Sequence, residues 1–376
     1  MSYCLHNGLR IQMVLNDDVT LSKTITFLRF PLIVAVIFIH TNLSGVVING
    51  ALLEDGAQFH IYRLVHYIIK EDLSRTAVPL FFFFSGFLFF YHSDFSFRVY
   101  GQKLKKRVRT LLIPYIFWNI VVLLFTLLSQ LFLSSMTSGR SRLIADYTWL
   151  DWLNLFWSHW DEMPICYQLW FIRDLMIVII FTPILYYAIK YGKIVTLLIL
   201  GGLWLAFDTS AKAPGFSLAA FFFFTFGAWY SINKQNFTVS FRFMRWPATF
   251  VYLSLVALDT WLWYRGVTGF PYINRLGIVV GLFAVISWTA YGIKKEDLHT
   301  SALLAGSSFF VYAYHGVPLA FVVKYWVKLL YPISESMMLL SYLLIPFFIA
   351  GIGVCIYALL RKYLPATTAL ITGGRL

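Results

Sequence analysis

The chain has 376 residues, of which 60% are hydrophobic, 19% aromatic and only 12% charged. A soluble globular domain carries roughly 45–50% apolar and about 25% charged residues, so this composition excludes that class, and it equally excludes a disordered or collagen-like chain. The formal charge of +13 comes from 30 Lys and Arg against 17 Asp and Glu. It indicates either a polyanion partner or the positive cytoplasmic loops of a membrane protein.

Apolar stretches of membrane-spanning length recur along the chain after residue 23. The hydrocarbon core of a bilayer is about 30 Å thick and needs roughly 20 helical residues. Lipid cannot satisfy open backbone groups, and the alternation typical of barrel strands is missing, so the sequence predicts an all-α transmembrane helical bundle. A count of eight to eleven spans is compatible with the sequence, and ten is the prediction. The ten expected spans are 24–41, 76–92, 111–134, 168–189, 194–207, 216–232, 247–264, 271–291, 302–323 and 337–360.

The charges divide unequally between the two sides of these spans. With a cytoplasmic N-terminus, the cytoplasmic segments hold 18 of the 30 Lys and Arg and five of the 17 acids. This asymmetry predicts cytoplasmic N- and C-termini in an inner (plasma) membrane protein, and it removes the need for a nucleic-acid partner. We expect a cytoplasmic tail over 1–23, a transmembrane domain over 24–362 and a second cytoplasmic tail over 363–376. Residues 1–20 lack the apolar run of a signal peptide.

Two long loops, 42–75 and 135–167, are predicted on the outer side. The second is rich in tryptophan and is either an interfacial aromatic belt or a stacking surface for a sugar. His60 and His66 are assigned to the first loop. The run His159-Trp160-Asp161-Glu162 in the second matches no common metal-site spacing, so no metal is expected.

The first span carries two ionisable residues, Arg29 and His40. They are three helical turns apart, so they project to about the same face with an axial separation of about 16 Å. Ionisable groups inside lipid are costly and are functional candidates by default. The alternative is that Arg29 snorkels to the inner interface and His40 simply lies at the outer one.

The densest charge in the chain follows the second span. Five cations lie between 103 and 109. They are an orientation signal that contacts anionic headgroups, a site for the phosphates of a donor, or both. The glycine-rich spacing of a phosphate-binding loop is missing. The four cations considered for donor binding are Lys103, Lys106, Arg107 and Arg109.

Other polar residues lie inside or at the edges of later spans. Arg173 and Asp174 follow Trp170 and, as neighbours about 100° apart on a helix, are expected to pair with groups on other helices. Asp174 either orients a histidine or neutralises a cation. His315 is either a buried, hydrogen-bonded core histidine or part of a site. Ser85, which precedes Gly86, reads as a small residue at a helix contact.

Together these residues resemble a known family. In chain order they are Arg29 and His40, Pro79 to Phe87 with Ser85-Gly86, the basic run closing on Pro114-Tyr115, Leu169-Trp170-Phe171 and Tyr312-x-x-His315. This pattern is similar to the acyltransferase-3 family of integral membrane O-acyltransferases over about 22–362.

The resemblance implies an acyl-CoA donor, acetyl-CoA or another, on the cytoplasmic side and a hydroxyl acceptor outside, such as a glycan or lipid-linked sugar. It implies that His40 is catalytic and that Arg29 and Arg109 support it. Lys106 stands where arginine is common, which keeps the charge but loses the planar fork. The hypothesis is that His40 is the general base or carries the acyl group, with Arg29 beside the carbonyl or pantetheine arm. The alternative function is a polysaccharide exporter or lipid-linked sugar flippase without acyl transfer.

Overall fold

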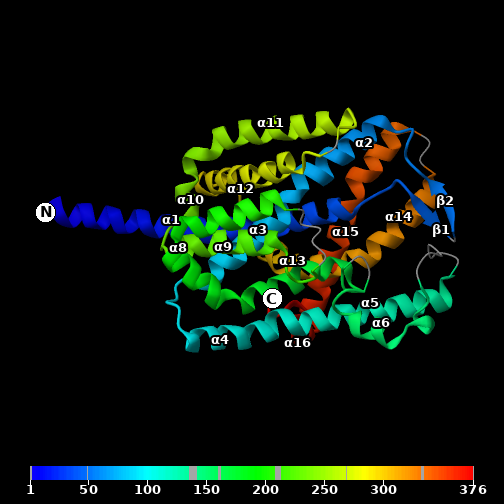
Figure 1. Cartoon of the computed structure of the whole chain (residues 1–376), viewed down its shortest axis with the longest axis horizontal. Helices are drawn as coiled ribbons and strands as arrows, with labels where there is room; N and C mark the ends of the chain where they lie inside the picture. The colour runs from blue at the N-terminus through cyan, green and yellow to red at the C-terminus, as the bar shows by residue number, and fades with distance from the viewer. Residues whose placement is uncertain are drawn as a thin grey trace.

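A computed structural model of the chain describes residues 2–48, 50–134, 142–159, 162–207, 213–267, 269–331 and 334–375. In these ranges the protein is a helical bundle, as the sequence predicts (Figure 1). A two-stranded antiparallel hairpin, β1 (Val46–Ile48) and β2 (Ala51–Glu54), is added to the helices at the end of the molecule opposite the N-terminus. The architecture follows from composition, because an apolar chain in lipid must satisfy its backbone internally.

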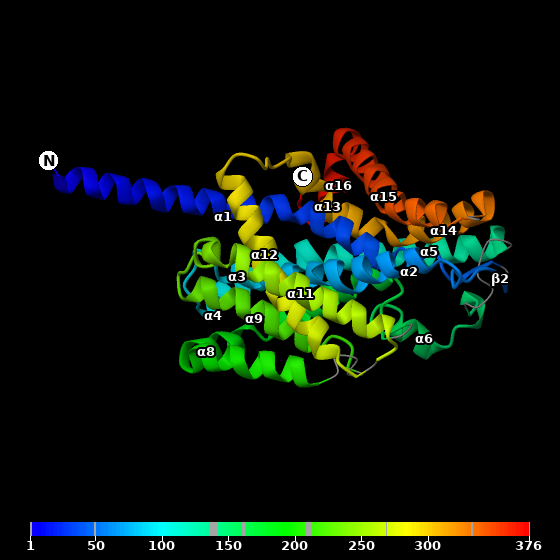
Figure 2. The same ribbon diagram turned by 90° about the horizontal axis from the view of Figure 1, so that it is seen from above.

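The long helix α1 (Ser2–His40) runs through the bundle, and its N-terminal part projects beyond it (Figures 1 and 2). After the hairpin, α2 (His60–Tyr67) continues through a π-helical segment (Ile68–Leu73) and a 3₁₀ turn (Ser74–Thr76) into α3 (Ala77–Phe90).

The prediction of a loop over 42–75 is therefore wrong from His60 onward, and His60 and His66 lie on a helix. The polar residues of this stretch have partners within the bundle. The Tyr62 amide donates to the Glu335 carboxylate at 2.8 Å, and Asn274 donates to Asp72 at 3.2 Å. These partners allow the helix to extend beyond its apolar part, a possibility that hydropathy alone does not reveal.

The remaining helices complete the bundle. They are α4 (Phe97–Arg107), a π-helical turn (Val108–Leu112), α5 (Ile113–Phe132), α6 (Trp149–Asn154), α7 (Trp170–Ile180), α8 (Thr182–Ala206), α9 (Leu218–Ile232), α10 (Phe237–Ser240), α11 (Arg245–Tyr264), α12 (Pro271–Lys294), α13 (Ala302–Tyr314), α14 (Gly316–Leu330), α15 (Glu335–Tyr363) and α16 (Pro365–Thr372). Three short 3₁₀ turns are Ile144–Asp146, Tyr167–Leu169 and Arg242–Met244.

Six helices in the described part of the chain are long and apolar enough to cross a membrane, or seven if α13 and α14, bent by 70°, form one broken span. The sequence predicts ten spans, and the predicted spans that are not among these six or seven also lie on helices. However, α7 has 11 residues and α9 has 15, and α8 bends at Lys193, where the backbone leaves helical geometry.

The tightest helix contact is between α3 and α9. A Cβ on Gly86 would lie 1.9 Å from the carbonyl oxygen of Phe224, and one on Gly227 would lie 1.8 Å from that of Phe83. Only glycine permits this approach, which is how helices pack closely in membranes. The expectation of a small-residue contact beside Ser85 is confirmed at Gly86.

Candidate active site

The face of α1 that carries Arg29 and His40 connects two cavities. Arg29, Ile33 and Val36 line a cavity of about 330 Å³, and His40 lines a pocket of about 350 Å³ beyond it. Steps of four, three and four residues keep all four side chains on one helix face. The predicted common face of Arg29 and His40 is confirmed.

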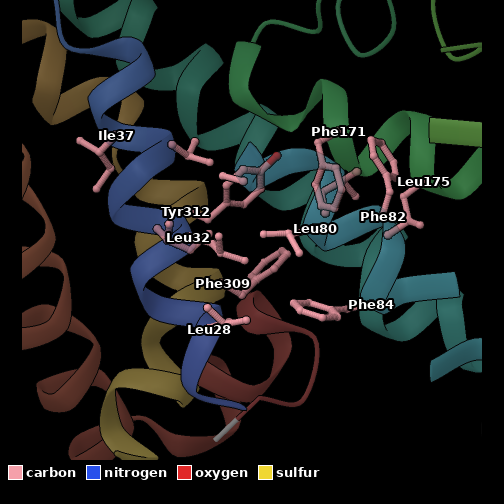
Figure 3. Packing of buried hydrophobic residues seen from close by; sticks show 14 of the residues in the cluster. Leu28, Leu32, Ile37, Leu80, Phe82, Phe84, Phe171, Leu175, Phe309 and Tyr312 are labelled. Carbon is pink, nitrogen blue, oxygen red and sulfur yellow. The ribbon is translucent and has the colours of Figure 1, made fainter. Parts of the chain in front are cut away.

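The cavity at Arg29, which we call the arginine cavity, is bounded by α1, α3, the end of α4 with the π-helical turn before α5, α7, α13 and the C-terminal residues Gly373 and Arg375. Arg29, Arg107 and Arg375 supply its charge, and the residues that line it include no Asp or Glu. Its apolar walls include Phe84, Phe171, Leu175, Phe309 and Tyr312, which surround the space between α1, α3 and α7 in Figure 3. A cavity with one sign of charge and apolar walls suits an anion on a long organic chain.

Arg375 was missed by sequence reasoning, which placed it in a cytoplasmic tail. No local motif marks it, because its position depends on the chain folding back after α15. Burial, together with the neighbouring charges of Arg107 and Arg29, lowers the pKa of the Arg375 guanidinium to about 10. It therefore remains charged at neutral pH, and the cavity holds three cations.

Two histidines meet between the arginine cavity and the pocket at His40. His315 lies at the bend between α13 and α14, is fully buried, and has its ring centre 5.5 Å from that of His40. The His315 Nδ1 lies 2.6 Å from the Tyr312 carbonyl oxygen, so Nδ1 carries the proton and donates it. The Nε2 atom then has a free lone pair, and in the described residues it has no hydrogen-bond partner.

The pocket at His40 is open and is lined by both polar and apolar side chains. Asn42, Ser44, Tyr167 and Lys324 contribute to it. The Tyr167 ring packs edge-on against His40 with ring centres 4.9 Å apart. Small polar molecules can therefore reach His40 from this end of the bundle.

A second, larger cleft of about 890 Å³ shares Asn42 and Ser44 with this pocket. Tyr67 and Trp263 stack in its wall with ring centres 4.3 Å apart, and the Tyr67 hydroxyl donates to Asp259 at 2.8 Å. Aromatic rings beside carboxylates and cations give this cleft the mixed surface that hydroxyl-rich molecules require.

The expected pairing of Arg173 and Asp174 with other helices is wrong for Asp174. Arg173 forms an ion pair with its neighbour Asp174 at 2.9 Å, and both side chains are buried. Arg173 also donates to the carbonyl oxygens of Trp157 and Glu162 at 2.5 and 2.6 Å. The long guanidinium arm spans the 100° between the two positions, so Asp174 neutralises a cation that braces the loop before α7.

The four basic residues expected to bind a donor divide into two groups. Arg107 lines the arginine cavity. Lys103 donates to the Phe89 carbonyl and the Ser93 hydroxyl instead, whereas Lys106 and Arg109 are exposed and do not line the cavity.

The other expected residues have simpler positions. Ser85 lines the arginine cavity, and Trp170 is half-buried against the hydrophobic core. His159 Nε2 lies 2.9 Å from the Tyr147 hydroxyl, and burial lowers the pKa of His159. Trp160 and Asp161 of the same run lie outside the described residues. Within the described ranges, no three His, Cys, Asp or Glu side chains gather as metal ligands.

Comparison with known proteins adds two matches. A family described as an acyltransferase domain matches residues 23–362. The chain is also 26% identical over 371 residues to the succinoglycan biosynthesis protein ExoH of Rhizobium meliloti (strain 1021), a match that covers 95% of this chain and 94% of that protein. No solved structure matches the chain.

Proposed function

Because the chain belongs to the acyltransferase-3 family and is an integral membrane acyltransferase, we propose that it transfers an acyl group, with acetyl as the proposed group, from cytoplasmic acyl-CoA to a hydroxyl on the other side of the membrane. The acceptor we propose is a cell-surface glycan or its lipid-linked precursor. The name of the relative, a succinoglycan biosynthesis protein, supports a polysaccharide acceptor.

The observation that carries this proposal is the continuous face of α1. A cationic cavity lies at Arg29, an open pocket with several polar side chains lies at His40, and the two histidines lie between them. A donor held by its phosphates at one end can place its thioester near His40, since a pantetheine arm is long enough to span the axial distance of about 16 Å.

The orientation we propose has the Asp17 end of α1 in the cytoplasm of an inner-membrane protein with ten spans. Asn236 donates to the Asp17 carbonyl at 3.0 Å, and Lys294 lies 3.9 Å from the Asp17 carboxylate. These contacts gather three of the predicted cytoplasmic segments at one end of the bundle. That agrees with the excess of Lys and Arg in those segments.

In the proposed reaction, His40 removes the proton of the acceptor hydroxyl. The hydroxyl oxygen attacks the thioester carbonyl, the carbon–sulfur bond breaks, and coenzyme A leaves as the thiol after taking up that proton. In the second route, His40 attacks first and carries the acyl group to the acceptor. Arg29 lies where the pantetheine arm meets the donor phosphates, and Arg107, with Lys103, Lys106 and Arg109 on the same basic stretch, attracts these phosphates.

The test uses purified protein in lipid nanodiscs, radiolabelled acetyl-CoA and a glycan acceptor. We expect His40→Ala to abolish label transfer to the acceptor while coenzyme A binding remains, because His40 lies outside the arginine cavity. His299→Ala is the matched control, since His299 is exposed on the loop after α12.

Full transfer by the His40→Ala variant would contradict the assignment of His40. Acceptor translocation in proteoliposomes without any label in the acceptor would instead support an exporter or flippase.

A further inference from the structure

The segment after α15 folds back into the bundle. Trp118 on α5 donates its indole N–H to the Ile371 carbonyl at 3.0 Å. The Tyr357 and Thr372 hydroxyls both donate to the Arg375 carbonyl, at 3.2 and 2.9 Å. Residues 365–375 are thus fixed by hydrogen bonds, although they lie beyond the part of the chain that the family matches.

A glycine allows this segment to reach the cavity wall. Gly373 ends α16 with a φ of 67°, and a Cβ there would lie 2.4 Å from the Thr110 carbonyl oxygen. Any larger residue would be strained and would also collide with the π-helical turn that carries Arg109 and Thr110. The close approach presses 373–375 against the turn that follows Arg107.

The Arg375 side chain is oriented from two sides. Its Nη1 donates to the Thr372 carbonyl at 2.6 Å and lies 3.4 Å from the Thr110 carbonyl, and its guanidinium lies 4.5 Å from the Phe309 ring centre. All of these contacts are neutral, so they position the charge without compensating it.

Three guanidinium groups therefore border one cavity, and the described residues that line it include no Asp or Glu. Like charges in a low-dielectric site repel, and an uncompensated charge away from water is unfavourable. The Thr110 hydroxyl, which also lines the cavity, is buried and has no hydrogen-bond partner in the described part of the chain. An anion in the cavity would neutralise the cations and could accept this hydrogen bond.

We propose that residues 365–375 form the closing wall of an anion site in which Arg375 joins Arg29 and Arg107 to bind a phosphate group. The planar guanidinium group of arginine donates paired hydrogen bonds to phosphate oxygens. Three such groups match the charges of a pyrophosphate. The choice of ligand rests on the proposed function: the phosphate group is the pyrophosphate of the acyl-CoA donor. The headgroup of an anionic lipid offers the same phosphate chemistry.

The test is calorimetric binding of coenzyme A to the purified protein in nanodiscs of neutral phosphatidylcholine. We expect Arg375→Gln to weaken coenzyme A binding at least tenfold, Arg375→Lys to restore part of it, and pantetheine, which lacks phosphate, to bind wild type and Arg375→Gln alike. The matched control is Arg98→Gln, which removes an exposed arginine on α4, the helix that also carries Arg107. The melting temperature of each variant shows whether it is folded.

Equal coenzyme A affinity for wild type and folded Arg375→Gln would overturn this inference and leave the proposed transfer reaction intact. A second arm titrates inorganic pyrophosphate and vesicles that contain phosphatidylglycerol. Arg375-dependent binding of these, with no binding of coenzyme A by wild type, would support the anion site and contradict the acyl-CoA donor. A wild-type protein that binds none of the probes would contradict both.

Discussion

The protonation of His315 is determined by a single neighbour. The Tyr312 carbonyl accepts from Nδ1, and the backbone after it turns sharply into α14, where a Cβ on Gly316 would lie 2.6 Å from the Gln168 side chain. The ring therefore carries an unprotonated Nε2, and its centre lies 5.5 Å from that of the His40 ring. Such a nitrogen can accept a proton from His40 or hold its ring in place.

This geometry predicts the effect of His315→Asn. Asparagine keeps an N–H for the Tyr312 carbonyl but removes Nε2, so we expect kcat to fall by about 10²- to 10⁴-fold with little change in KM for the donor. Steady-state kinetics with labelled acyl-CoA measures the two constants separately. Unchanged kcat in the folded variant would show that His315 is a core residue only.

For single residues, the sequence predicts those positions that follow from helix periodicity. The shared face of Arg29 and His40 follows from their spacing alone. The position of Arg375 does not, because it depends on a fold-back that no local pattern encodes. The prediction that Arg173 and Asp174 do not pair with each other is wrong, because the 100° angle between neighbouring helix positions does not take the length of the arginine side chain into account.

Among the elements, the α3–α9 contact is the most sensitive to substitution. The backbones meet at Gly86 and Gly227, where an added Cβ would lie less than 2 Å from a carbonyl oxygen of the facing helix. Each of these helices carries a run of four phenylalanines, Phe81–Phe84 on α3 and Phe221–Phe224 on α9, and both runs pack in the hydrophobic core.

Gly227→Ala is expected to lower stability by about 1–3 kcal/mol, since an added methyl must push the two helices apart. The melting temperature in detergent measures this effect. Gly351→Ala on α15 is the control: nothing lies within 4 Å of its Cβ, and alanine favours a helix there. If Gly227→Ala melts at the wild-type temperature, the close contact is not maintained in solution.

Hydropathy predicts the elements best where a helix is apolar throughout. It fails at 60–76, where polar residues continue the helix by pairing inside the bundle, and it cannot reveal the bend at His315. Both exceptions border the candidate site, where polar groups are retained despite their cost in lipid.

For the whole molecule, the charge asymmetry of the sequence predicts which end faces the cytoplasm. We expect a cysteine at Arg265 to react with a membrane-impermeant maleimide in intact cells, and a cysteine at His299 to react only after the cells are opened. Both positions are exposed, and they lie at the ends of α11 and of the segment after α12. The background has its three native cysteines replaced by serine, and the reverse labelling pattern would invert the proposed topology.

The histidine pair between the two cavities also has a consequence for the energy of the cell. His315 is fully buried and Tyr312 nearly so, and with His40 and Tyr167 their rings occupy the space between the arginine cavity and the open pocket. An acyl group handed across this layer needs no water-filled passage and no alternation between inward- and outward-open states. In the proposed reaction, a surface glycan would therefore be modified from a cytoplasmic donor without leaking ions or dissipating the membrane potential.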